Sequence, residues 1–137
     1  MSRERFELRR NQYLKALDRL HEVLQLEDTM AGRPATERSV IRDATIQRFE
    51  FTYEMAWQAM KDWLREAGVD AANPKDTFAG AYTNRLITDE SGWSEMQIFR
   101  NKTSHTYDEA KALEVVAFVR ATAVGLFDEL AARLKSL

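Results

Sequence analysis

The stretch Gln47–Leu64 reads QRFEFTYEMAWQAMKDWL, and it decides the fold. Residues spaced three and four apart form one apolar stripe that consists of Phe49, Tyr53, Ala56, Met60 and Leu64. This period predicts an α-helix. Other apolar residues point elsewhere, namely Phe51, Met55, Trp57 and Trp63. A helix that is apolar on more than one face must be covered on both sides. We expect a homodimer in which a second copy supplies one cover, with the central helix of a monomeric bundle as the alternative.

The predicted helix extends beyond this stretch in both directions. It begins at Thr36 and ends at Ala67, and Gly68 provides the C-terminal stop. Towards its start, the apolar stripe continues through Val40, Ile41 and Ala44.

The rest of the chain is predicted to be helical as well. The first helix has an apolar stripe of Phe6, Tyr13, Leu17, Leu20 and Leu24, and a linker at Met30–Ala35 follows it. Asn73 and Pro74 are typical of a helix start, and the third helix is predicted to carry Phe78, Tyr82 and Leu86.

The remaining elements are a turn and two helices. Thr88–Gly92 is predicted to be the turn, and a short fourth helix then opens with Trp93, Met96 and Phe99. A final helix spans Tyr107–Lys135, with its stripe at Val116, Val119, Ala123, Phe127, Leu130 and Leu134. The prediction is therefore an all-α, up-down bundle of about five helices in a single domain, residues 1–137.

Composition limits the function classes. The 137 residues are 45% hydrophobic and 31% charged, which is typical of an ordered globular chain. The formal net charge of -2 argues against nucleic-acid binding by overall electrostatic attraction, so any RNA contact requires a local basic patch. There is no cysteine, which excludes disulfides and thiolate metal sites. No signal peptide or membrane-spanning run is visible, and we expect a cytoplasmic protein without a membrane partner.

Chemically useful side chains are concentrated at residues 100–107, which read RNKTSHTY. On an uninterrupted helix Arg100 and His105 would point about 140° apart. Thr106 and Glu109 fit a capping box, however, which predicts a helix break before residue 107. We expect the turn to bring Arg100, at the end of one helix, back towards His105, just before the next.

Such a turn is suited to phosphate chemistry. The N-terminus of a helix favours a bound anion. Arg100 can donate two parallel hydrogen bonds to a phosphate group, and Lys102 adds a positive charge. Histidine exchanges protons near neutral pH. These groups fit the cleavage of RNA by its own 2′-OH, which requires no metal site. The structural alternatives are that Arg100 pairs with Glu95 or Glu54 and that His105 packs at a helix junction. His21 is interpreted as structural or surface.

Two blocks of sequence together resemble a known family. Residues 100–107 are similar to the R-x4-H-x-Y motif of HEPN domains. Residues 47–57, residues 61–64 and Trp93 extend the similarity over nearly the whole chain. This combination resembles the branch known as nucleotidyltransferase substrate-binding proteins, whose HEPN members are toxins paired with minimal nucleotidyltransferase antitoxins.

The resemblance implies a dimeric HEPN bundle in which two motifs face one cleft, and a metal-independent endoribonuclease without a cofactor. It implies that His105 is the general base or acid, that Arg100 clamps the phosphate and that Asn101 orients the site. Tyr107 corresponds to the tyrosine that receives AMP from the nucleotidyltransferase, which silences the toxin. The Gly-Ser loop and Asp-x-Asp pair of the transferase are absent from this sequence.

Several assignments stay open at this stage. Glu54 and Ser104 are possible cleft residues, and we favour a structural role for Glu50. One alternative function is a non-catalytic subunit that presents a nucleotide or other substrate to a separate nucleotidyltransferase. A helical dimer without any site is the other.

Overall fold

The computed structural model describes residues 2–137, and within that range every regular element is helical. The helices are α1 (Ser2–Glu27), α2 (Ala35–Glu66), α3 (Pro74–Thr83), α4 (Glu90–Lys102), α5 (Glu109–Phe118) and α6 (Val124–Lys135). A 3-10 turn, Thr103–His105, follows α4, and a π-helical turn, Val119–Ala123, joins α5 to α6. Because α5 and α6 continue through that turn, the predicted all-α bundle of about five helices is confirmed.

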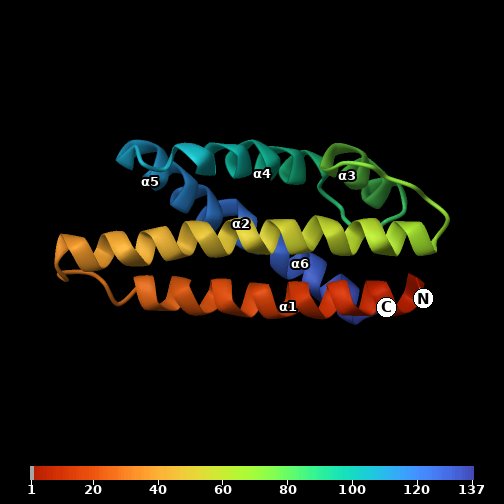
Figure 1. Ribbon diagram of the computed structural model, residues 1–137, viewed down its shortest axis with the longest axis horizontal. Helices are drawn as coiled ribbons and strands as arrows, with labels where there is room; N and C mark the ends of the chain where they lie inside the picture. The colour runs from red at the N-terminus through yellow and green to blue at the C-terminus, as the bar shows by residue number, and fades with distance from the viewer. Residues whose placement is uncertain (1) are drawn as a thin grey trace.

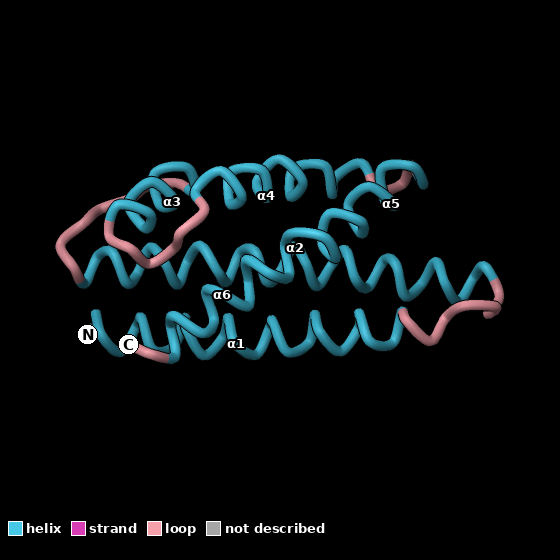
Figure 2. Tube along the Cα trace, turned by 180° about the vertical axis from the view of Figure 1, so that it is seen from behind, coloured by secondary structure: helices cyan, strands magenta, loops and turns pink. Residues whose placement is uncertain are grey.

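The two long helices α1 and α2 form the base of the bundle and run antiparallel, and the first turns of α2 extend past the end of α1 (Figure 1). Helices α3 and α4 cover the opposite side of α2. The view from behind shows the α5–α6 segment crossing diagonally from the α4 side to α1 (Figure 2). The start of α1 and the end of α6 lie at the same end of the molecule. The chain itself therefore covers α2 on two sides.

Aromatic side chains from five helices, α1, α2, α3, α4 and α6, fill the centre of the bundle. The ring of Trp93 lies 5.5 Å from that of Phe78 and 5.7 Å from that of Phe127, measured between centroids. Tyr13 of α1 donates a hydrogen bond to the carbonyl oxygen of Phe127 at 2.5 Å, which ties α1 to α6. The apolar stripe predicted for the first helix is buried throughout, as expected.

The predicted boundaries of α2 are right to within one residue, and Gly68 has a φ of +84°, as a C-terminal stop requires. Asn73 caps α3, and its side chain accepts a hydrogen bond from the N–H of Asp76 at 2.9 Å. In the N-terminal part of the predicted α2 stripe only Val40 is wrong, because it is 61% exposed, whereas Ile41 and Ala44 are partly buried against the core. That part of α2 extends beyond the helices that cover the centre of the bundle.

Three other predictions need correction. Thr88–Gly92 is not wholly a turn, because Asp89 caps α4 and places residues 90–92 in its first turn. Tyr82 is half exposed, and Leu86 is buried from the loop after α3. The final helix begins at Glu109 and not at Tyr107. His21, interpreted as structural or surface, contacts Asp128 on α6 at 2.7 Å.

Across residues 2–137, no helix is both long and apolar enough to span a bilayer.

Candidate functional site

Residues 100–107, called the motif segment below, turn the chain between α4 and α5. Hydroxyl groups of this segment cap the last carbonyl oxygens of α4. Thr103 Oγ1 donates to the Arg100 oxygen at 2.7 Å, and Ser104 Oγ donates to the Asn101 oxygen at 3.0 Å. A helix end leaves such carbonyl groups without partners inside the helix. The Thr and Ser residues of the motif segment therefore stabilise the turn locally.

Asp108 caps α5, and the predicted capping box of Thr106 and Glu109 is wrong. The Asp108 carboxylate accepts hydrogen bonds from the N–H groups of Ala110 at 2.9 Å and Lys111 at 3.4 Å. Thr106 instead donates to the carbonyl oxygen of Thr103 at 3.1 Å. Since Asp108 already places a negative charge on the N–H groups of α5, a phosphate expected at this helix start would have to compete with that carboxylate.

The Arg100 side chain is directed towards α2. Its Nη1 atom lies 3.4 Å from Glu50 Oε2, and its Nε atom lies 3.6 Å from Glu54 Oε1. Nη1 also donates to Thr103 Oγ1 at 3.1 Å. One guanidinium thus bridges two carboxylates that are one helical turn apart. The predicted alternative partner Glu54 is confirmed, whereas Glu50 takes the place proposed for Glu95.

Two aromatic residues of α2, predicted from the sequence only as apolar positions, place polar groups near this cluster. The Trp57 indole N–H donates to Glu54 Oε2 at 3.0 Å, which orients the carboxylate. The Tyr53 hydroxyl is buried without a hydrogen-bond partner among the described residues. Burial raises the pKa of Tyr53, the Glu54 carboxylate raises it further, and the Arg100 guanidinium opposes the rise. The spacing of Glu54 and Trp57, three apart on one helix, was the available sequence signal.

Lys102 is directed towards α5 and not towards Arg100. Its Nζ atom lies 4.4 Å from the centroid of the Phe99 ring and 4.0 Å from Glu114 Oε2. Phe99 in turn stacks on Phe118 with 4.1 Å between ring centroids. Lys102 therefore packs over the junction of α4 and α5.

His105 and Tyr107 lie on the solvent side of the motif segment. Tyr107 is 87% exposed, and its ring centroid is 6.2 Å from that of His105. Asn101 and Ser104 are exposed too. No hydrogen bond or ion pair joins His105 to Arg100 in the chain from residue 2 onward. Within one chain the two groups therefore face different surroundings, and their shared cleft stays a prediction that requires a second chain.

Among residues 2–137, no group of three His, Cys, Asp or Glu side chains is arranged to hold a metal ion.

Residues 8–136 match the protein family described as "Nucleotidyltransferase substrate binding protein like". A curated relative from Haemophilus influenzae, named "Probable ribonuclease HepT", is 36% identical over 90 residues. This match covers 62% of the present chain and only 62% of the length of that relative.

Two solved structures share the fold. The first is a Haemophilus influenzae protein described as having the fold of a substrate binding domain of a nucleotidyltransferase. It is 27% identical, with a TM-score of 0.86, and the match covers 92% of the present chain and 98% of the other. The second is a protein from Thermus thermophilus, 32% identical, with a TM-score of 0.75 and coverage of 90% and 98%.

Proposed function

Because the chain belongs to the nucleotidyltransferase substrate-binding protein family, which is of the HEPN type, we propose that it is the toxin component of a two-protein system. Its partner is a minimal nucleotidyltransferase antitoxin, and its activity is the cleavage of RNA without a metal ion. The name of the Haemophilus relative, a ribonuclease, supports this activity. One observation supports the proposal most. Arg100 forms ion pairs with Glu50 and Glu54, and the same short segment exposes the side chains of His105 and Tyr107.

In the proposed reaction the 2′-OH of the RNA attacks the adjacent phosphorus atom. His105 accepts the proton of the 2′-OH, and the bond from phosphorus to the 5′ oxygen breaks. A proton returns to that 5′ oxygen, so the products are a cyclic phosphate and a free 5′-OH. Arg100 binds the phosphoryl oxygens as negative charge develops, through donors left over from its two ion pairs. Asn101 orients the substrate next to it.

Tyr107 is the proposed acceptor of AMP. Two observations support this role: the side chain of Tyr107 is 87% exposed and so accessible to a second protein, and its ring centroid is 6.2 Å from that of His105, the proposed proton-transfer group. In the transfer the Tyr107 oxygen attacks the α-phosphorus of ATP, the nucleotidyltransferase removes the hydroxyl proton, and pyrophosphate leaves. The bulky anionic adduct then excludes RNA from the site.

The test uses the purified chain together with the nucleotidyltransferase. We expect the wild type to cleave RNA and His105→Ala to lose cleavage while it keeps its helical circular dichroism spectrum. Incubation with the partner and ATP should add the mass of one AMP to the peptide that contains Tyr107, and Tyr107→Phe should abolish this addition. Intact RNA after incubation with the wild type would refute the ribonuclease proposal.

A second function is supported by one specific observation. The Haemophilus protein with the same fold is described as a substrate binding domain of a nucleotidyltransferase. On that basis the chain would hold a nucleotide or other substrate for a separate transferase and would cleave nothing. Isothermal titration with nucleotides separates the two functions, since this one predicts binding without cleavage and an unchanged affinity in His105→Ala.

A further inference from the structure

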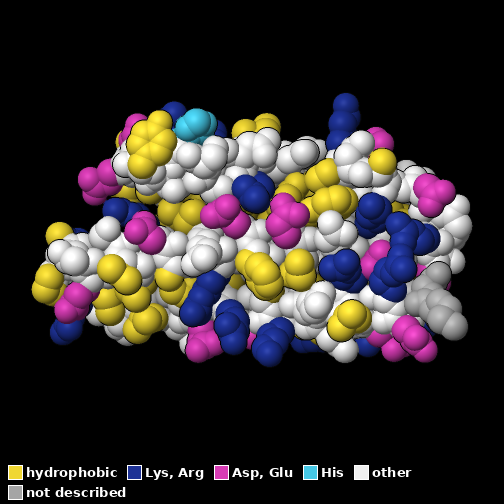
Figure 3. Space-filling model, viewed as in Figure 1, with side chains coloured by type: hydrophobic (Ala, Val, Ile, Leu, Met, Phe, Trp, Pro, Cys, Tyr) yellow, Lys and Arg dark blue, Asp and Glu magenta, His cyan; other side chains and the backbone are white. Residues whose placement is uncertain are grey.

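Phosphate binding by this chain depends on local groups of cations. The formal net charge is -2, and on the face shown in Figure 3 the basic side chains occur in separate groups with acidic side chains between them. Within residues 2–137, two cavities are each lined by at least two cations. Their positions relative to Tyr107 differ, and so does what each of them can bind.

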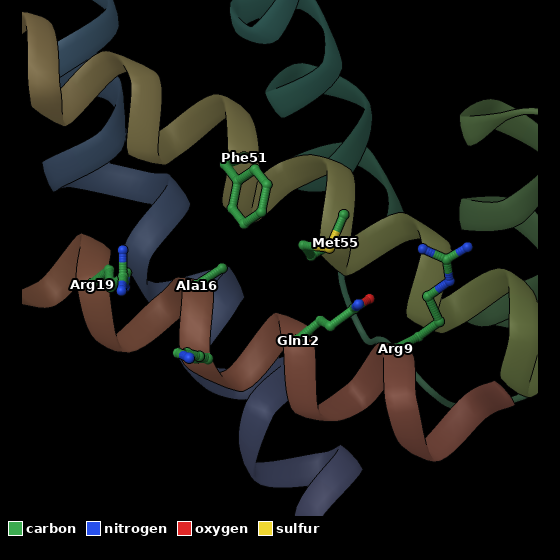
Figure 4. A pocket seen from close by; sticks show the side chains of 7 residues that line it. Arg9, Gln12, Ala16, Arg19, Phe51 and Met55 are labelled. Carbon is green, nitrogen blue, oxygen red and sulfur yellow. The ribbon is translucent and has the colours of Figure 1, made fainter. Parts of the chain in front are cut away.

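The first cavity, of about 380 Å³, lies between the middle parts of α1 and α2. Figure 4 shows Arg9 and Arg19 on α1 and Phe51 and Met55 on α2 around it. None of its lining residues belongs to the motif segment or to α5. This cavity therefore serves as a matched control for the second one.

The second cavity, called the α2–α5 cavity below, has a volume of about 550 Å³ and lies between the first turns of α2 and the start of α5. Its wall includes Thr36, Arg38, Ser39 and Arg42 of α2, and Glu109 and Leu113 of α5. Ligand cavities in proteins typically measure roughly 300–1,000 Å³ and combine apolar walls with a few polar groups. The size and lining of the α2–α5 cavity fit a mononucleotide.

The two arginines of the α2–α5 cavity have hydrogen-bond donors to spare. Arg38 and Arg42 are one helical turn apart, so their side chains are neighbours on α2. Arg38 is exposed and makes no ion pair within residues 2–137. The Nε atom of Arg42 is buried without a partner in the described part of the chain. Because an unsatisfied buried donor costs free energy, rotation of this side chain onto an anion in the cavity is favourable.

Glu109 competes only weakly for Arg42. Its Oε1 atom lies 3.5 Å from Arg42 Nη1, and its side chain is 75% exposed. Ion pairs with such exposure contribute little, because water screens them. Only one nitrogen of Arg42 contacts Glu109, whereas a phosphate group can accept two parallel hydrogen bonds from one guanidinium. A phosphate that enters the cavity can therefore displace Glu109.

Tyr107 lies next to this cavity along the chain. Two residues separate it from Glu109, and they span at most about 7 Å. The side chain of Tyr107 is 87% exposed, so an AMP group on its hydroxyl is held by nothing unless another part of the chain binds it. The first N–H groups of α5 already donate to Asp108. The phosphate of the adduct therefore requires other donors, and the α2–α5 cavity supplies them.

We propose that the α2–α5 cavity binds a nucleoside monophosphate and that its occupant is the AMP carried by Tyr107. Arg38 and Arg42 bind the phosphate, and Leu113, which is 52% exposed, contacts the nucleoside. The identity of the occupant rests on the proposed function, whereas the presence of a nucleotide site does not. An adduct bound in this cavity has a fixed position near His105, so it obstructs the site more effectively than a freely moving one.

Protection of the adduct tests the proposal. The wild type and the double variant Arg38→Gln/Arg42→Gln are modified with the nucleotidyltransferase and ATP, and a purified phosphodiesterase is then added. Intact mass spectrometry follows the loss of AMP. We expect the double variant to lose AMP at least about tenfold faster, because it lacks the charged donors that hold the phosphate. Glu109→Gln should retain AMP at least as long as the wild type, since it frees Arg42.

Matched variants separate the cavity from a general effect of charge. Lys15→Gln/Arg19→Gln removes two cations of the same spacing from the wall of the first cavity, and it should protect the adduct as the wild type does. Ser39→Trp fills the α2–α5 cavity without a change in charge, and it should lose AMP as fast as the double arginine variant. Circular dichroism spectra verify that each variant is folded.

Free AMP tests the cavity without the partner protein. Backbone amide NMR spectra of the unmodified chain are recorded during titration with AMP. We expect shifts at residues 36–42 and at Leu113, and an affinity at least about tenfold lower in Arg38→Gln/Arg42→Gln. Inorganic phosphate should shift the α2 residues and leave Leu113 unchanged, because it has no nucleoside.

The outcomes that overturn the proposal differ from those that refute the proposed function. No shift with AMP, equal loss of the adduct from the wild type and the double arginine variant, or equal loss from Lys15→Gln/Arg19→Gln would each overturn it. Weaker RNA binding by the double arginine variant, with its adduct still protected, would assign the cavity to RNA and also overturn it. Binding of AMP in the cavity by a chain whose Tyr107 is never modified would support the nucleotide site and refute only the modification.

Discussion

Replacement of Arg100 by alanine separates a structural role from a chemical one. In the folded chain Arg100 makes two ion pairs, at 3.4 and 3.6 Å, and one hydrogen bond to Thr103. Since these groups are 29–40% exposed, each ion pair contributes about 0.2–1 kcal/mol. The hydrogen bond contributes about 0.5–1.5 kcal/mol. We therefore expect Arg100→Ala to lower the free energy of unfolding by about 1–3.5 kcal/mol.

The effect on RNA cleavage should be larger. If Arg100 stabilises the charge of the transition state, its loss lowers kcat/KM by about 100- to 1,000-fold, by analogy with the removal of one oxyanion donor. Domains of this size have free energies of unfolding of about 5–15 kcal/mol, so most of the variant stays folded and unfolding cannot account for such a loss. The assays are urea denaturation followed by circular dichroism, and single-turnover cleavage of a labelled RNA.

Glu54→Gln is the matched control. It removes one ion pair of Arg100 and leaves the guanidinium, and its amide oxygen still accepts from the Trp57 indole. We expect a similar or smaller loss of stability with cleavage at or above the wild-type rate. The reasoning is refuted if Arg100→Ala cleaves at the wild-type rate, or if Glu54→Gln loses as much activity. A rise in KM alone would assign Arg100 to ground-state binding of RNA.

Three further substitutions test the fold and the turn. The pKa of Tyr53 is raised in the folded state, so its contribution to stability is present below about pH 10 and is lost as the pH rises above that value. In urea denaturation, the free energy of unfolding of Tyr53→Phe should therefore fall less steeply at alkaline pH than that of the wild type. An identical pH profile would contradict this. Trp93→Ala removes a buried ring in contact with two others and should cost about 3–5 kcal/mol in chemical denaturation, so a cost under about 1 kcal/mol would show that the centre repacks. Asp108→Ala should lower the free energy of unfolding by about 0.5–2 kcal/mol and increase hydrogen exchange at the N–H groups of Ala110 and Lys111. Unchanged exchange would show that the carboxylate does not cap α5.

The periodicity of apolar residues was sufficient for most of the fold. Phe49, Tyr53, Ala56, Met60 and Leu64 are all buried, because a helical period places them on the side of α2 that the bundle covers. A helix end could also be predicted where a single residue caps it, as Asn73 caps α3 by accepting the N–H of Asp76. The prediction failed at Thr106 because both Thr106 and Asp108 are residue types that can cap a helix start. In the structure the Asp108 carboxylate, and not the Thr106 hydroxyl, accepts the first N–H groups of α5.

The sequence by itself determined that this chain is helical, that α2 is its long central element, and that an arginine, a histidine and a tyrosine share one short segment. These features depend on neighbours within a few positions of one another. Only the tertiary structure decided that Arg100 bridges Glu50 and Glu54 and faces away from His105. That arrangement depends on how α4 lies against α2, a helix from much earlier in the chain, and local spacing contains no information about such packing.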